Sequence, residues 1–254
     1  MRVAHTVEDL IGSTPLVDLS SLAGGSARVL GKLEAANPGG SAKDRVARAM
    51  VDDAERTGRL SPGGTIIEPT SGNTGVGLAM VAAARGYRLV LTMPDTMSVE
   101  RRALAAAYGA TIELTPGTEG MAGAVARAEE LAAATPNSII AGQFDNPANP
   151  RAHYETTGPE IWADTDGTVD VLVAGVGTGG TLCGSARYLK EKNPAVRAVA
   201  VEPAESRVLA GGAAGPHAIQ GIGANFVPGN FDRSLVDEIM PVSSADALAT
   251  WRRL

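Results

Sequence analysis

Hydrophobic positions recur along this chain with two periods, one typical of helices and one of strands. Over residues 43–57, Val46, Met50 and Ala54 recur at helical spacing, which predicts an amphipathic helix. Short runs of β-branched and aliphatic residues predict strands at 65–68, 88–93, 111–114, 138–141, 169–174 and 196–201. Because helical patterns lie between these strands, the sequence predicts an α/β fold with mostly parallel sheets flanked by helices.

The same patterns indicate where the elements end and where the chain divides. Helices are predicted before Gly86, from a cap at Ser98 to near Tyr108, around 123–134, up to Lys192, and from Ala245. At 145–150, two prolines and two asparagines occur within six residues, and this loop signal predicts a domain boundary. The segment 211–229 is rich in glycine and proline, which predicts an irregular loop.

Composition narrows the classes of function. The 254 residues carry a formal net charge of −6, so a general attraction to nucleic acid or to an anionic membrane is not expected. No apolar run reaches the length of a membrane span and the N-terminus lacks a signal-peptide pattern, which predicts a soluble, cytoplasmic protein. Cys183 is the one cysteine and the three histidines are far apart, so neither an intrachain disulfide nor a metal site is expected.

A glycine-rich loop, Gly175-Val-Gly-Thr-Gly-Gly-Thr181, follows a predicted strand and opens a predicted helix. Glycine lets the backbone approach a ligand, and a helix N-terminus presents N–H groups to an anion, so the loop favours a bound phosphate. The spacing also fits a dinucleotide fingerprint, because Glu202 stands about 20 residues further on, where a dehydrogenase places its ribose-binding acid. A tight turn without a ligand is the third interpretation.

A second loop, Thr70-Ser-Gly-Asn-Thr-Gly75, joins another predicted strand to a helix. Its hydroxyl and amide side chains, together with backbone N–H groups, can surround a small carboxylate. Helix capping is the simpler interpretation, but a cap needs only one such side chain. The sequence therefore favours a binding site for a small anion here.

Lys43 opens the predicted helix that follows Asn37-Pro-Gly-Gly-Ser-Ala42. A cation there opposes the helix dipole, and desolvation favours the neutral amine, which can attack a carbonyl or accept a proton. A solvated surface lysine is the common alternative. Packing or solvent accounts for Cys183, His153 and His217, so no functional role is expected for them.

Seven motifs in one order carry a family resemblance. They are 10–16 (LIGSTPL), 37–45 (NPGGSAKDR), 68–75 (EPTSGNTG), 143–147 (QFDNP), 157–162 (TGPEIW), 175–181 (GVGTGGT) and 220–224 (QGIGA). Together they resemble the cysteine synthase and cystathionine β-synthase family of pyridoxal-phosphate enzymes. The resemblance implies a two-lobed enzyme of fold type II, with a smaller, mobile lobe at 37–146 and a larger lobe formed by 1–36 and 147–254.

The resemblance also implies the role of each site residue. Lys43 would be the catalytic residue and would bind pyridoxal 5'-phosphate as a Schiff base, with Asn73 on the phenolic oxygen of the cofactor. The cofactor phosphate would be held by Gly177, Thr178, Gly179, Gly180 and Thr181. The substrate would be bound by Thr70, Ser71, Thr74, Gln143 and Gly221. No metal is implied.

The implied reaction is a β-replacement that converts O-acetylserine and sulfide into cysteine and acetate. Lys43 would remove the Cα proton and later return it, while the cofactor serves as an electron sink. The loop at 70–75 would close over the substrate and shield the reactive aminoacrylate from water. The family also implies a homodimer and a cleft that binds the C-terminus of serine acetyltransferase.

Two alternatives stay open. Cystathionine β-synthase, which uses homocysteine in place of sulfide, shares most of these motifs, although 143–150 looks more like the sulfhydrylase version. Members of the family continue past a helix like 245–254 into a strand and a serine-containing loop that meets the pyridine nitrogen. We therefore expect the C-terminal part of the fold to be missing, and a truncated, non-catalytic pyridoxal-phosphate-binding homologue is the second alternative.

Overall fold

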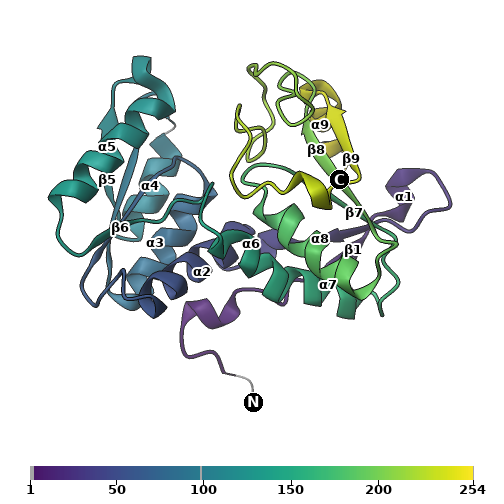
Figure 1. The fold of residues 1–254 in the computed structure, drawn as a ribbon, viewed down its shortest axis with the longest axis horizontal. Helices are drawn as coiled ribbons and strands as arrows, with labels where there is room; N and C mark the ends of the chain where they lie inside the picture. Colours follow the sequence, from purple (N-terminus) through teal and green to yellow (C-terminus); the bar gives the residue numbers. More distant parts are fainter. Residues whose placement is uncertain (1–2, 98, 254) are drawn as a thin grey trace. The chain divides into compact units, whose positions relative to one another are not determined.

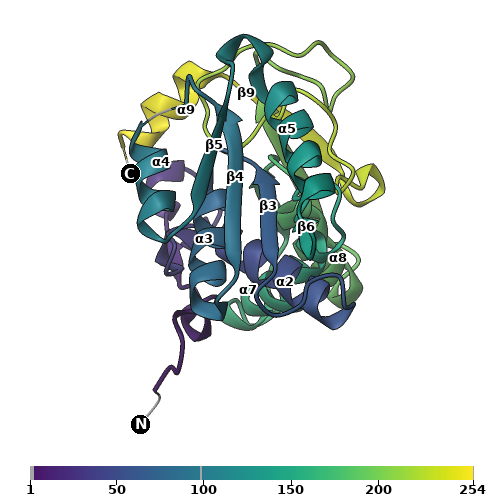
Figure 2. The same cartoon turned by 90° about the vertical axis from the view of Figure 1, so that its left-hand side faces the viewer.

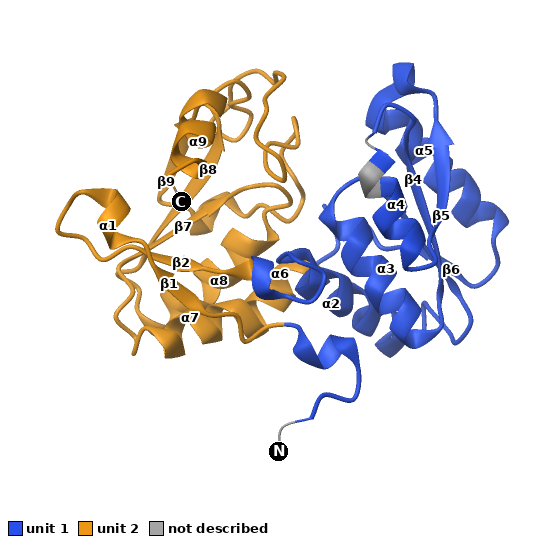
Figure 3. Ribbon diagram, turned by 180° about the vertical axis from the view of Figure 1, so that it is seen from behind, with its two compact units in different colours: residues 1–11, 35–148 blue, residues 12–34, 149–254 orange. Residues whose placement is uncertain are grey.

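The chain divides by its internal contacts into two compact units (Figure 3). The computed structural model describes residues 3–97 and 99–253. Unit 1 is Met1–Ile11 with Ala35–Ala148, and unit 2 is Gly12–Glu34 with Asn149–Leu254. Within unit 1, the Glu8 carboxylate accepts a hydrogen bond of 2.9 Å from Arg85 Nε. The lobes expected at 37–146 and at 1–36 with 147–254 stay a prediction. The mobility of 37–146 stays a prediction.

Unit 1 is built on a parallel sheet of four strands in the order β5-β4-β3-β6 (Figures 1 and 2). The strands are β3 (Thr65–Pro69), β4 (Arg88–Pro94), β5 (Thr111–Thr115) and β6 (Ser138–Ile140). The helices are α2 (Lys43–Arg56), α3 (Asn73–Arg85), α4 (Val99–Ala107) and α5 (Gly120–Ala134), with 3-10 turns at Val7–Leu10, Glu34–Ala36 and Gly117–Glu119. Helix α5 covers one face of the sheet, and α2, α3 and α4 lie on the other.

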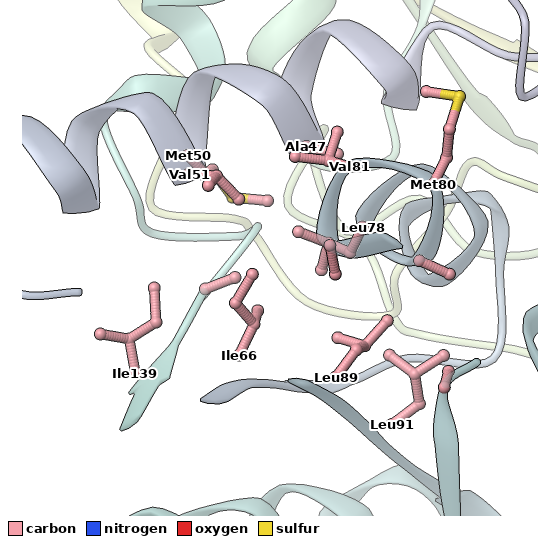
Figure 4. Packing of buried hydrophobic residues seen from close by; sticks show 14 of the residues in the cluster. Ala47, Met50, Val51, Ile66, Leu78, Met80, Val81, Leu89, Leu91 and Ile139 are labelled. Carbon is pink, nitrogen blue, oxygen red and sulfur yellow. The ribbon is translucent and has the colours of Figure 1, made fainter. Parts of the chain in front are cut away.

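The core of unit 1 lies between its sheet and helices α2 and α3 (Figure 4). Met50 of α2 and Leu78 of α3 pack against Ile66 and Leu91 of the strands, and all four side chains are buried. Each side chain of this size contributes about 1.5–3 kcal/mol by its burial. This packing holds the first turns of α2 and α3, where site residues were predicted.

Unit 2 holds a parallel sheet of three strands in the order β7-β8-β9 and a separate antiparallel pair, β1 and β2. The strands are β1 (Leu16–Asp18), β2 (Leu30–Lys32), β7 (Val171–Gly175), β8 (Arg197–Pro203) and β9 (Glu238–Val242). The helices are α1 (Ser20–Ala23), α7 (Gly158–Asp164), α8 (Gly180–Lys192) and α9 (Ser244–Trp251), with a π-helix at His153–Thr157 and a 3-10 turn at Arg233–Leu235. Helix α6 (Ala148–Ala152) contains the boundary between the units.

The predicted strands are confirmed as β3 to β8, with small shifts at their ends, and the segment 211–229 is irregular as expected. The loop predicted at 145–150 is wrong in its second half, because α6 begins at Ala148. Pro150 lies in the first turn of that helix, where a missing N–H costs nothing. Ser98 lies outside the described residues, so its capping of α4 stays a prediction. Among the described helices, none is long and apolar enough to span a membrane.

Candidate functional site

The carboxyl ends of β3 and β6 bring two predicted binding segments together in unit 1. Chain connections lead from β3 outward through β4 to β5, whereas β6 returns to the opposite side of β3. The strand order therefore reverses between β3 and β6, and ligands of open α/β sheets bind at such a reversal. The loop at 70–75 leaves the end of β3, and Gln143 follows the end of β6.

A direct hydrogen bond joins these two segments. The Thr74 hydroxyl donates to Gln143 Oε1 over 2.6 Å, and both residues are buried. Thr70 is also buried, and its Oγ1 accepts a hydrogen bond of 3.2 Å from the N–H of Gly72, which shapes the loop. Of the predicted substrate residues, Thr74 and Gln143 are thus hydrogen-bonded to each other, and Thr70 shapes the loop that leads to Thr74.

The loop at 70–75 is not explained by helix capping. The N-cap of α3 is Gly72, and no side-chain hydrogen bond caps the described helix. Asn73 is exposed at the first position of α3, and Ser71 is partly exposed. Their polar groups and the first N–H groups of α3 are therefore presented at the helix N-terminus, where an anion is stabilised.

Lys43 lies partly buried at the first position of α2. Its backbone N–H donates to Ser41 Oγ over 3.2 Å, and the turn before it has Gly40 at a φ of 83°. A Cβ on Gly77 of α3 would stand 3.0 Å from the Lys43 carbonyl oxygen, so a glycine there lets α3 pack closely on the start of α2. The close packing of α3 thereby fixes the backbone of the predicted catalytic lysine. The contact lies at Gly77, about one helix turn after the start of α3.

In unit 2, the glycine loop joins β7 to α8 as predicted, and close backbone approach explains its glycines. Gly179 is the N-cap of α8 with a φ of 84°. A Cβ on Gly177 would overlap the carbonyl oxygen of Gly221, and a Cβ on Gly180 would overlap the side chain of Asn149. The N-terminus of α8 is consequently lined by backbone, with no side chain of the loop's glycines to block an anion.

Two residues that sequence analysis left without a role support the hydroxyls of this loop. Asn149 is 0% exposed, and its Nδ2 donates to Thr178 Oγ1 over 2.9 Å. A hydroxyl oxygen that accepts this bond keeps its own hydrogen for an anion. The Asn-Pro-Ala-Asn-Pro motif contained this residue, but a loop signal says nothing about the partner of one of its side chains.

His153 lies four residues beyond Asn149 and contacts the same loop. It is 0% exposed, with Nδ1 2.9 Å from Thr157 Oγ1 and Nε2 3.1 Å from Thr181 Oγ1. The tautomer protonated on Nε2 donates to Thr181 and leaves the Thr181 hydrogen for an anion. The sequence does not indicate a functional role for His153, because only the fold shows that its ring reaches the loop.

Glu202, which raised the dinucleotide interpretation, has a structural position instead. It is fully buried at the end of β8, and its Oε2 accepts the N–H of Leu209 over 2.9 Å. A carboxylate enclosed in this way does not present itself to a ribose hydroxyl. Cys183 is buried and burial raises the pKa of its thiol, which suits packing rather than nucleophilic chemistry.

Comparisons with known proteins cover nearly the whole chain. The sequence profile of the family described as pyridoxal-phosphate dependent enzyme matches residues 7–254. Cysteine synthase A of Escherichia coli (strain K12) is 53% identical over 253 residues, which are 96% of this chain and 78% of that protein.

Solved structures agree with this match. Cysteine synthase from Entamoeba histolytica has a TM-score of 0.94 at 47% identity, covering 97% of this chain and 74% of that one. O-ureido-L-serine synthase has a TM-score of 0.96 at 50% identity, covering 100% of this chain and 80% of that one. This chain therefore belongs to the family of pyridoxal-phosphate dependent enzymes.

Proposed function

We propose that this protein is a cysteine synthase, which converts O-acetylserine and sulfide into cysteine and acetate with pyridoxal 5'-phosphate as its cofactor. The observation that carries the proposal is the identity of 53% with cysteine synthase A over 96% of the chain. The hydrogen-bonded cluster at the ends of β3 and β6 supports it, because the cluster suits the carboxylate of an amino-acid substrate.

Each unit, taken by itself, has described residues that fit one part of the cofactor. In unit 2, the N–H groups at the start of α8 and the hydroxyls of Thr178 and Thr181 suit a phosphate, and Gly177 and Gly180 leave room for it. In unit 1, Lys43 is partly buried at the first position of α2, and its primary amine can form a Schiff base with an aldehyde. We assign the cofactor to Lys43, Asn73 and 177–181, and the substrate to Thr70, Ser71, Thr74, Gln143 and Gly221.

When bound, pyridoxal phosphate withdraws electrons from the substrate Cα and so makes its proton acidic. Lys43 Nζ removes that proton and returns it to the same carbon at the end of the reaction. Between these two events the Cβ–O bond to acetate breaks and a Cβ–S bond to sulfide forms. Hydroxyl, amide and N–H groups of the loop at 70–75 hold the substrate carboxylate, which keeps Cα in reach of the lysine.

Turnover tests this proposal. Protein supplied with pyridoxal phosphate, O-acetylserine and sulfide should release cysteine and acetate in equal amounts, and the Lys43→Ala variant should lose this activity. Replacing sulfide by homocysteine tests for cystathionine synthesis instead. One solved structure, at 40% identity and a TM-score of 0.91, is an O-acetylserine dependent cystathionine β-synthase. A protein that binds the cofactor yet yields neither product would contradict the proposal and favour the non-catalytic alternative.

We also propose that the enzyme acts in the cytoplasm as a homodimer with a smaller, mobile lobe at 37–146, and that it binds the C-terminus of serine acetyltransferase. These proposals rest on the family resemblance. Light scattering of the purified protein gives its mass in solution, and a peptide copied from that C-terminus should compete with O-acetylserine. A monomeric mass, or no competition by the peptide, would contradict the corresponding proposal.

A further inference from the structure

Glu68 is a buried carboxylate at the point where β6 leaves the sheet of unit 1. It is 1% exposed and is the second-to-last residue of β3. Its Oε2 accepts the N–H of Gly142 over 2.7 Å, and its Oε1 accepts the N–H of Gln143 over 3.2 Å. Both carboxylate oxygens therefore hold the backbone at the first two residues after Ala141, where Gly142 has a φ of 70°.

The Gln143 side chain also hydrogen-bonds to Glu68, while its Oε1 accepts the Thr74 hydroxyl. An ionised carboxylate can only accept, so the Gln143 amide must turn its NH₂ group toward Glu68 and its oxygen toward Thr74. Without such a partner, the amide can rotate by half a turn and exchange donor for acceptor. With the Thr74 hydrogen donated to Gln143 Oε1, the second N–H of the Gln143 amide is the donor that this pair offers to an anion, and Glu68 fixes the orientation that presents it.

Among the described residues, the groups that act on Glu68 are neutral. Burial raises the pKa of Glu68 to about 7, and the N–H groups of Gly142 and Gln143 and the Gln143 side chain oppose this rise. A buried carboxylate without a cationic partner is costly, and replacement by an apolar residue is often tolerated where only stability matters. Its position between β3 and the substrate cluster indicates a role in that cluster.

We propose that Glu68 is a positioning residue for the substrate carboxylate, which acts by fixing the backbone and the amide orientation of Gln143. This inference rests on the proposed function, in which Gln143 and Thr74 bind that carboxylate. Glu68 itself does not contact the reacting atoms. Its loss should therefore weaken substrate binding while the chemical step stays intact.

The test compares steady-state kinetics at pH 8, where Glu68 is ionised, for wild type, Glu68→Gln, Gln143→Ala and the double variant. Glu68→Gln should raise the KM for O-acetylserine by about tenfold or more, as expected for a lost hydrogen bond to a charged group, with kcat close to wild type. In the Gln143→Ala background the same substitution should have little further effect, because its target is gone. Asp53→Asn, which alters a buried carboxylate on α2 that pairs with Arg56 and Arg59, is the control for loss of a carboxylate outside this cluster.

Amide hydrogen exchange gives a readout that does not depend on turnover. Glu68→Gln should reduce the protection of the Gly142 and Gln143 N–H groups, and Asp53→Asn should not. Two results would overturn this inference while the proposed function stands. One is a fall in kcat at unchanged KM, and the other is an equal rise in KM on Glu68→Gln in the wild-type and Gln143→Ala backgrounds. Absence of turnover by the wild type would overturn the proposed function and this inference with it.

Discussion

Glu68 and Glu202 are both fully buried glutamates at the carboxyl ends of parallel strands, but they hold different parts of the chain. Glu68 accepts two consecutive backbone N–H groups beside the loop at 70–75. Glu202 accepts the N–H of Leu209 in the irregular segment after β8. Because both carboxylates are buried, each depends on these hydrogen bonds. Burial also raises the pKa of Glu68.

The titration of Glu68 predicts how pH alters stability. Folding raises its pKa from 4.5 to about 7, so the folded chain binds this proton more tightly than the unfolded chain. The resulting stabilisation is complete below about pH 4.5 and is lost as pH rises through 7, and it amounts to roughly 3 kcal/mol. Urea denaturation at several pH values should show the free energy of unfolding of wild type falling relative to Glu68→Gln over this range. Parallel pH profiles for the two proteins would contradict this assignment.

Sequence patterns predicted most of this architecture, and they located the two loops at 70–75 and 175–181. They did not identify Glu68, Asn149 or His153 as supporting residues, because each acts through a partner that only the fold brings near. The short strands β1, β2 and β9 were not predicted either. Strand β9 contains Pro241 and β2 contains Gly31, and proline or glycine within a short apolar run argues against a strand.

At the scale of elements, α8 and the loop that precedes it depend on close contact with the segment at 221–223. The N–H of Gly223 donates to the Val176 carbonyl over 2.9 Å, and Gly177 faces the carbonyl oxygen of Gly221. These backbone contacts leave no room for a side chain at 177. The N-terminus of α8 therefore owes its shape to two segments about 45 residues apart in the sequence.

A methyl group at residue 177 should disturb this arrangement. Gly177→Ala forces the backbone at Gly221 to move, which should cost about 1–3 kcal/mol of stability and weaken the uptake of pyridoxal phosphate. Gly25→Ala is the control, because a Cβ on Gly25 meets nothing within 4 Å. Urea denaturation and titration with the cofactor measure the two effects. If Gly177→Ala behaved like the control, the close contact with Gly221 would not shape the loop.

At the scale of the whole molecule, each unit has candidate residues at the carboxyl ends of parallel strands, whereas Lys43 opens α2 and Gly221 lies in an irregular segment. The loop at 70–75 follows β3, Gln143 follows β6, and the glycine loop follows β7. Helices α3 and α8 begin at two of these three places. At both, the first backbone N–H groups of the helix are available to an anion. One physical arrangement thus supports the carboxylate site of unit 1 and the phosphate site of unit 2.

Attachment of the cofactor to Lys43 is the central claim, and one measurement tests it most directly. The protein is incubated with pyridoxal phosphate, reduced with borohydride and digested, and the modified peptide is identified by mass spectrometry. We predict that the reduced cofactor is found on Lys43 and that Lys43→Ala abolishes the labelling at this peptide. Labelling confined to other lysines, or no labelling of the wild type, would contradict the account.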